Sequence, residues 1–216
     1  MSAQLAFDLK LANPLAHRYF VAHSGVIQAV QALEQALAEL RLDQQHFVSL
    51  YVFGAESTGK SHLLTAYQER ALELGLENSC FLDLSSLDQV REGGELEGSV
   101  VSSYDALCSG GGLFLAVGAF SPQSNELSPH VRSRLLAGRV FELAMPQESE
   151  LRPVLLSMME RKNLRISDFS LNYLLKRLPR NPLSFGVIFA KIHQLCFGDG
   201  RPANWSAVRE VVDLLD

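Results

Sequence analysis

The sequence predicts an α/β fold in which a parallel sheet with helices on its faces is followed by an all-helical domain. Up to Pro146, short apolar runs rich in β-branched and aromatic residues alternate with segments whose apolar residues recur every three or four positions. This alternation indicates parallel strands joined by helices through right-handed crossovers. After Pro146 the helical periodicity continues without an intervening strand. The two patterns therefore divide the chain into an α/β core and a helical region.

The first part of the core has the pattern helix, strand, loop, helix, strand. Apolar residues at three-and-four spacing predict a helix over residues 26–40, and the apolar run of residues 47–53 predicts a strand buried on both faces. A glycine-containing loop follows directly, and residues 61–74 form the next predicted helix, which ends at Gly75. Residues 80–84 then predict a second strand.

The rest of the chain completes the sheet and then becomes helical. Residues 100–107 predict a helix that the glycine triplet at 110–112 breaks, and residues 113–117 and 139–143 predict the third and fourth strands. Four helical segments follow, at residues 150–160, 169–178, 183–197 and 205–215. We therefore expect three regions, namely a flexible tail over residues 1–12, the α/β core over 13–146 and a helical lid domain over 147–216.

A glycine-rich loop between the first strand and the following helix carries the strongest functional signal. Its residues 54–61 match the phosphate-binding pattern G-x-x-x-x-G-K-S, the P-loop. In such a loop the backbone N–H groups point at phosphate oxygens, and the helix N-terminus adds partial positive charge. Lys60 is expected to contact the β- and γ-phosphates of ADP or ATP, and Ser61 to offer its hydroxyl to Mg²⁺. The residues expected to bind the nucleotide are Gly54, Glu56, Ser57, Thr58, Gly59, Lys60 and Ser61.

Composition and charge exclude several other classes of protein. The chain has 216 residues, 47% of them hydrophobic, which is enough to bury a core. Its formal net charge of −5 does not favour direct DNA binding through phosphate neutralisation. No run approaches about 18 apolar residues and no signal peptide precedes the core, so we expect a cytoplasmic protein without a membrane span. The cysteines form no CxxC pair and the histidines show no ligand spacing, so no disulfide framework or protein-only metal site is predicted.

Two segments resemble the AAA+ family that contains the bacterial replication initiator DnaA and its short homologue Hda. The run GKSHLL at residues 59–64 is similar to the phosphate-binding loop of this family. The run VRSRL at residues 131–135, followed by Gly138, looks like its arginine-finger segment. The resemblance therefore makes Arg134 the candidate for a finger that acts in trans on a nucleotide held by a partner. The sequence ends where DnaA would continue into a helix-turn-helix DNA-binding domain, so the resemblance favours the Hda type.

The resemblance also implies an AAA+ P-loop core with a parallel sheet and a helical lid. The chain between Gly75 and Leu113 is too short for two strands with their helices. The sheet is therefore expected to be one strand smaller than that of the family.

A short N-terminal peptide resembles the motif by which Hda-type proteins dock on the DNA polymerase sliding clamp. This peptide is QLAFDL at residues 4–9. It would bind in an extended form, with Gln4 in a polar site and Leu5, Phe7 and Leu9 in apolar pockets. The resemblance thus implies two partners, the sliding clamp and a DnaA-type AAA+ protein, and leaves a homodimer open. The alternative for this peptide is a tail of ordinary composition.

The acidic pair of an AAA+ ATPase is missing from this sequence. The family places it at the end of a buried strand, where it holds Mg²⁺ and orients the attacking water. One alignment puts Ser85 and Ser86 in these two positions. The other assigns residues 80–84 to the preceding strand of the family, with the acidic strand deleted. Both alignments remove the carboxylates, unless Asp83 or Asp88 is the catalytic acid.

Two further positions of the family pattern carry apolar residues. Ala119 stands near the position of a polar residue that contacts a phosphate, and Leu183 stands where the lid presents an arginine to the nucleotide. Arg177 or Arg180 could substitute for that arginine. Together with the missing acidic pair, these changes predict nucleotide binding without hydrolysis.

Three functions remain open at this point. The first is an Hda-like negative regulator of DNA replication initiation that joins the sliding clamp to a DnaA-type partner. The second is an active AAA+ ATPase whose catalytic acid is Asp83 or Asp88. The third is a DnaA-related DNA-loading adaptor, which would need a basic surface that the net charge does not suggest.

Overall fold

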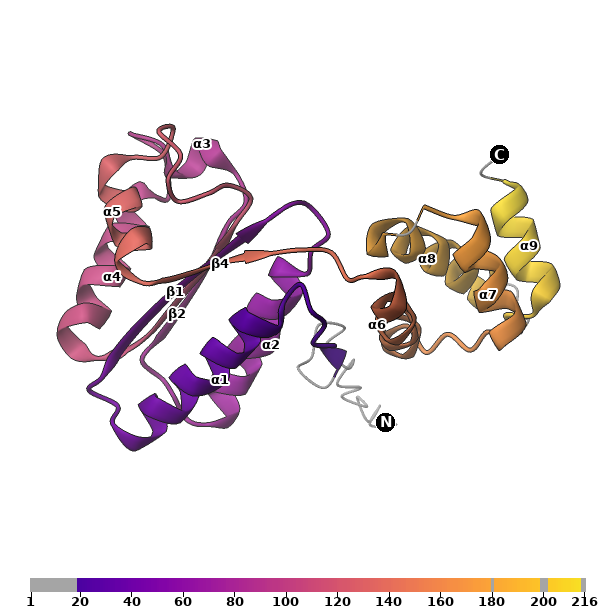
Figure 1. The fold of residues 1–216 in the computed structure, drawn as a ribbon, viewed down its shortest axis with the longest axis horizontal. Helices are drawn as coiled ribbons and strands as arrows, with labels where there is room; N and C mark the ends of the chain where they lie inside the picture. Colours follow the sequence, from indigo (N-terminus) through magenta and orange to yellow (C-terminus); the bar gives the residue numbers. More distant parts are fainter. Residues whose placement is uncertain (1–18, 180, 199–201, 215–216) are drawn as a thin grey trace, which may run out of the picture.

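The computed structural model describes residues 19–179, 181–198 and 202–214, which form an α/β core and a helical domain (Figure 1). The strands of the core are β1 (Phe47–Gly54), β2 (Ser79–Leu84), β3 (Gly112–Gly118) and β4 (Arg139–Leu143). Its helices are α1 (Ile27–Leu42), α2 (Lys60–Glu73), α3 (Leu87–Val90), α4 (Glu97–Gly110) and α5 (Pro129–Ala137). The helical domain contains α6 (Glu148–Arg161), α7 (Asp168–Arg177), α8 (Pro182–Gly198) and α9 (Trp205–Asp213). The predicted fold class is confirmed.

The four strands form a parallel sheet in the order β2-β3-β1-β4. β1 and β3 are the central strands and are covered on both faces, which explains their almost continuous apolar sequences. β2 and β4 are the edge strands, and each exposes one acidic residue, Asp83 or Glu142, beside a buried leucine. Because the strands are parallel, their carboxyl ends meet at one edge of the sheet, where ligands bind in open α/β folds. The glycine-rich loop lies at this edge.

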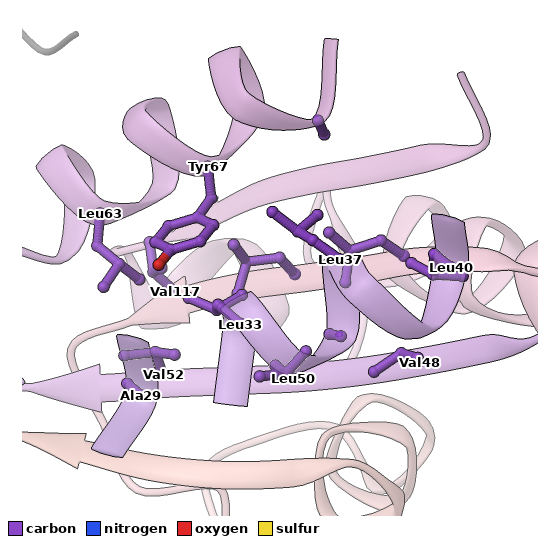
Figure 2. Packing of buried hydrophobic residues seen from close by; sticks show 14 of the residues in the cluster. Ala29, Leu33, Leu37, Leu40, Val48, Leu50, Val52, Leu63, Tyr67 and Val117 are labelled. Atoms are coloured by element: carbon purple, nitrogen blue, oxygen red, sulfur yellow. The ribbon is translucent and has the colours of Figure 1, made fainter. Parts of the chain in front are cut away.

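Helices α1 and α2 cover one face of the sheet, and α4 and α5 cover the other (Figure 1). On the first face, Leu33 and Leu37 of α1 and Leu63 and Tyr67 of α2 pack over Leu50 of β1 (Figure 2). All five side chains are at most 1% exposed. This packing fixes the start of α2, and with it the end of the glycine-rich loop, on a rigid sheet.

Two helices of the core were not predicted from periodicity. α3 has only four residues, and α5 buries only Val131 and Leu135, which is too few to produce a helical stripe. The start of α5 nevertheless carries a recognisable signal. The Ser128 hydroxyl accepts a hydrogen bond from the backbone N–H of His130, and Pro129 occupies the first turn.

The helical domain has an apolar core of its own, to which α6, α7, α8 and α9 all contribute. It is tied to the α/β core by Glu150 in the first turn of α6. The Glu150 carboxylate accepts hydrogen bonds of 2.7 Å from both the backbone N–H and the hydroxyl of Ser24, just before α1. Within the described ranges, no helix is long and apolar enough to cross a membrane.

Candidate nucleotide-binding site

The loop between β1 and α2 needs its glycines at two positions. Gly59 has a φ of 98°, in the left-handed region that side chains disfavour. A Cβ on Gly54 would lie 2.5 Å from the carbonyl oxygen of Leu143 at the end of β4. Ser57 also has a left-handed φ, of 64°, although it carries a Cβ. Such strained backbone is typical of functional loops, and here it produces the tight turn that phosphate binding requires.

Lys60 lies inside this loop, with its side chain folded back over the backbone. Its Nζ donates hydrogen bonds to the carbonyl oxygens of Gly54, at 2.8 Å, and Ala55, at 2.7 Å. Burial lowers the pKa of Lys60 below its ordinary value, and the nearby charges of Asp83 and Glu56 partly offset this effect. The buried ammonium is therefore held by neutral carbonyl groups at the point where a phosphate would arrive.

Asp83 lies beside Ser61. Neither of the two alignments with the family, both of which removed the acidic pair, predicted a carboxylate at this place. The Ser61 hydroxyl donates a hydrogen bond of 3.1 Å to one carboxylate oxygen of Asp83. The other oxygen accepts hydrogen bonds from the backbone N–H of Ser85, at 3.1 Å, and from its hydroxyl. In P-loop NTPases Mg²⁺ is held by the loop Ser or Thr and by an Asp from the sheet. Ser61 and Asp83 supply the hard oxygen donors that suit this ion.

An open cleft of about 510 Å³ lies over the end of the glycine-rich loop, where phosphates are expected. It is lined by Glu56, Ser57, Gly59, Lys60, Ser61, His62, Ser85 and Ala119. Ala119 thus lines the same cleft as the loop, where the resemblance implied a polar side chain, and its methyl group offers no hydrogen bond. Ser85 lines the cleft too, which favours the alignment that puts it in an acidic position. In the described part of the chain, no group of three or more His, Cys, Asp or Glu could hold a metal alone.

A second cavity, of about 460 Å³, adjoins the loop and lies between the core and the helical domain. Its core side contains Ser57, Thr58 and Gly59 of the loop together with the segment before α1. The helical-domain side comes from α6 and α8, and it is mostly apolar. Leu183 lies in this wall, where the resemblance implied an arginine. An apolar cavity next to a phosphate-binding loop has the chemistry to accept a nucleoside.

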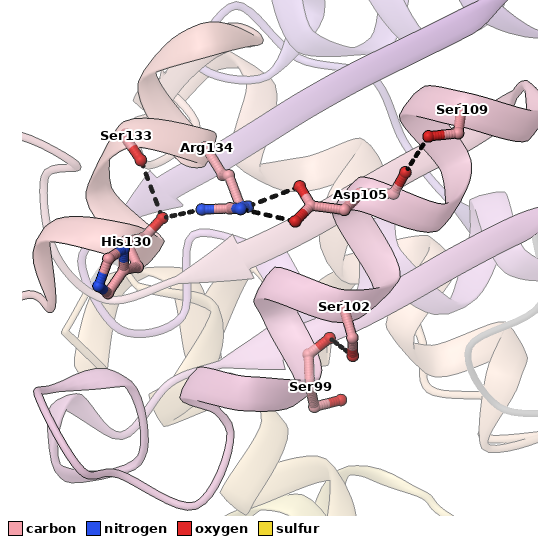
Figure 3. A network of polar contacts seen from close by, with 7 residues as sticks. All are labelled: Ser99, Ser102, Asp105, Ser109, His130, Ser133 and Arg134. Atoms are coloured by element: carbon pink, nitrogen blue, oxygen red, sulfur yellow. Dashed lines mark hydrogen bonds and ion pairs between the residues drawn. The ribbon is translucent and has the colours of Figure 1, made fainter.

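Arg134 projects from α5 onto α4, where Asp105 holds it (Figure 3). Its Nε and Nη2 donate to the two carboxylate oxygens of Asp105 at 2.9 and 2.7 Å, and its Nη1 donates to the carbonyl oxygen of His130 at 3.0 Å. The guanidinium holds the pKa of the Asp105 carboxyl below its ordinary value. The candidate finger is therefore engaged within its own chain, and Asp105 is a partner that the sequence did not reveal.

The predicted clamp-binding residues Gln4, Leu5, Phe7 and Leu9 lie outside the described residues. The structure places the predicted nucleotide-binding residues together around one loop. Arg134 belongs to a different part of the core, on the helical layer formed by α4 and α5.

The sheet, the loop and the helical domain together form the fold of DnaA domain III. No family profile matches the sequence, and no curated protein matches it. Solved structures do match. Domain III of the replication initiation protein DnaA from Thermotoga maritima superposes with a TM-score of 0.72 at 14% identity, over 93% of this chain and 96% of that chain.

Two further matches extend the same comparison. AMPPCP-bound DnaA from Aquifex aeolicus gives a TM-score of 0.67 at 16% identity, over 85% of this chain and 65% of that one. The RuvB Holliday junction branch migration motor of Thermotoga maritima gives 0.61 at 17% identity, over 88% and 70%. At these identities the likeness shows a shared fold.

Proposed function

We propose that this chain is a nucleotide-binding AAA+ regulator of DNA replication initiation, of the Hda type, with little or no ATP hydrolysis of its own. The observation that carries this proposal is the loop itself, with a buried lysine at its centre and two clefts beside it, one polar and one apolar. Together they suit the phosphates and the nucleoside of ADP or ATP. The AMPPCP bound to the DnaA neighbour supports the same ligand class. Calorimetric titration of the purified chain with ADP and ATP tests this step directly.

The residues around the phosphates favour binding over hydrolysis. Asp83 and Ser61 can hold Mg²⁺, whereas Ala119 and Leu183 leave the γ-phosphate without a polar or cationic side chain at two positions. The bound nucleotide therefore keeps its main contacts with the protein, whereas the transition state of hydrolysis lacks some of the contacts that would stabilise it. The position of Asp83 also supports the second candidate, an active ATPase, because its carboxylate lies beside the Ser61 hydroxyl and could hold Mg²⁺ there.

Replacement of Asp83 by Asn separates these two candidates. We expect Mg²⁺ to increase the affinity of the wild-type chain for ATP, and we expect Asp83→Asn to lose most of this increase, about tenfold, because an amide cannot balance the charge of the ion. Phosphate release by the isolated wild-type chain should not exceed that of Lys60→Ala. Turnover that depends on both Lys60 and Asp83 would establish the ATPase instead. Asp168→Asn is the matched control, since Asp168 is also exposed, pairs with Arg152 and lines neither cleft.

The proposed partner for the α5 side is a DnaA-type AAA+ protein, and the proposed role of Arg134 is that of a finger in trans. A guanidinium that now binds a carboxylate with two parallel hydrogen bonds has the geometry to bind a phosphate in the same way. A homodimer could use the same surface.

The proposed partner for residues 4–9 is a DNA polymerase sliding clamp. A short extended peptide concentrates its affinity in a few anchors, so Gln4→Ala combined with Phe7→Ala should abolish co-elution of the chain with the clamp. Asp8→Ala serves as the control, because Asp8 is not one of the expected anchors. Normal co-elution of the double variant would remove the clamp from the proposal while leaving nucleotide binding intact.

A further inference from the structure

Arg161 stands out among the residues that line the cavity between the two domains. It is the last residue of α6 and belongs to the helical-domain wall, facing the same cavity as Ser57, Thr58 and Gly59 of the loop. Its Nε is buried and has no hydrogen-bond partner among the described residues. The buried donor is thus left unsatisfied beside a space large enough for a ligand.

The charge of Arg161 is not balanced by the cavity wall. None of the described residues that line the cavity is acidic, and apart from Arg161 its ionisable lining residues are Tyr19, His23 and His62. Burial lowers the pKa of the Arg161 guanidinium below its ordinary value. A partly buried cation without a counter-charge is costly, and a bound anion would remove most of that cost. The cavity therefore suits a ligand that is apolar over most of its surface and anionic at one point.

The position of this charge matters because the opposite wall contains the loop that is proposed to bind phosphate. The loop amides and Lys60 approach a phosphate chain from the core, whereas Leu183 brings no charge to it from the helical domain. Arg161 supplies a positive charge on the helical-domain side of the cavity. An arginine also binds phosphate with paired donors, which suits it to this task.

We propose that Arg161 contacts a phosphate group of the nucleotide bound at the loop and so ties the helical domain to the bound nucleotide. This inference rests on the proposed nucleotide binding. The phosphate can belong to the 5′ chain held by the loop or to a 2′- or 3′-phosphate on the ribose. Both sources present the same chemistry to the guanidinium.

The test compares the wild-type chain with Arg161→Met, which keeps the length of the side chain and removes its charge. Each is titrated calorimetrically with adenosine, AMP, ADP and adenosine 3′,5′-bisphosphate. We expect Arg161→Met to weaken binding of the nucleotides that carry the contacted phosphate by about 10- to 100-fold and to leave adenosine binding unchanged, because one charge-assisted contact is lost. Arg165→Met is the matched control, since Arg165 is exposed and does not line the cavity. Arg161→Lys should recover part of the affinity.

The source of the phosphate follows from the pattern of losses. Equal losses for AMP, ADP and the bisphosphate assign the contact to the 5′ chain, and a loss confined to the bisphosphate assigns it to the ribose phosphate. A second readout separates ligand binding from folding: the ligand-free Arg161→Met variant should melt at the wild-type temperature or higher, because an unbalanced buried charge is removed.

Three results overturn the inference. They are equal affinities of Arg161→Met and the wild type for both ADP and adenosine 3′,5′-bisphosphate, a loss for adenosine as large as that for the phosphorylated ligands, and a marked fall in the melting temperature of the ligand-free variant. Absence of ADP binding by the wild-type chain is a different failure, since it removes the proposed function first.

Discussion

Arg134→Ala is expected to abolish the stimulation of ATP hydrolysis in a DnaA-type partner. Arginine fingers supplied by a neighbouring subunit accelerate phosphoryl transfer by about 10³–10⁵-fold, because they stabilise charge that develops only in the transition state. The measurement is phosphate release by the partner with this chain and clamp on DNA. The variant should still bind the partner and the clamp, so the substitution should lower the rate of ATP hydrolysis without weakening the complex.

The structure adds a condition to this prediction, since Arg134 must first leave Asp105. The two side chains are 21% and 55% exposed, and ion pairs open to solvent contribute little to stability. Arg134 can therefore leave the Asp105 carboxylate and bind a phosphate held by the partner at a small cost in free energy. Asp105→Asn should keep the stimulation or raise it modestly, since it releases the guanidinium without changing its charge.

Arg132 provides the matched control for Arg134. It lies on the same helix and donates to the side-chain carbonyl of Asn125 at 3.1 Å, and no carboxylate among the described residues pairs with it. Arg132→Ala should leave stimulation close to the wild-type level. If Arg134→Ala also leaves it unchanged, the finger assignment is removed, and the ion pair with Asp105 serves only to join α4 to α5.

The strands and the larger helices could be predicted because burial on both faces of a parallel sheet leaves a clear pattern. β1 and β3 are apolar almost throughout. In the edge strand β2, successive side chains point to opposite faces of the sheet, so Asp83 lies on the other face from the buried Leu84. α5 could not be predicted in this way, because its inner face contains only two buried residues. Its N-terminal signal at Ser128 and Pro129 was the available evidence for a helix.

The loop residues could be predicted because Gly59 and Lys60 belong to the local sequence pattern G-x-x-x-x-G-K-S. Asp105 and Arg161 could not be assigned, and Asp83 could be named only as an alternative catalytic acid, because each acquires its role from a residue distant in sequence. The pairing of Asp83 with Ser61 requires β2 to end at the loop, and that of Asp105 with Arg134 requires α4 to pack on α5. The cavity around Arg161 exists only once the helical domain is placed against the loop.

Lys60→Ala is expected to weaken ADP and ATP binding by about 100- to 1000-fold while leaving adenosine binding unchanged. Each charge-assisted hydrogen bond to a phosphate is worth about 1.5–3 kcal/mol, and the ammonium can reach two phosphates at once. In the free protein the same ammonium is held by the carbonyl oxygens of Gly54 and Ala55. Charged phosphates bind an ammonium more strongly than neutral carbonyls do. The Lys60 ammonium is therefore already positioned at the loop before a nucleotide binds.

The adenosine titration distinguishes loss of a phosphate contact from collapse of the loop. Removal of the ammonium takes one donor from the carbonyl oxygens of Gly54 and Ala55. The Ala55 oxygen still accepts the hydrogen bond of 2.9 Å from the Thr58 hydroxyl, which remains to hold the loop. If the loop keeps its shape, the interdomain cavity keeps its affinity for adenosine and only the phosphate-dependent part is lost. Parallel losses for adenosine and ADP would show that Lys60 supports the loop rather than the phosphates, and equal ADP affinities of variant and wild type would remove the phosphate site altogether. Lys176→Ala, on the exposed side of α7, controls for the change in net charge.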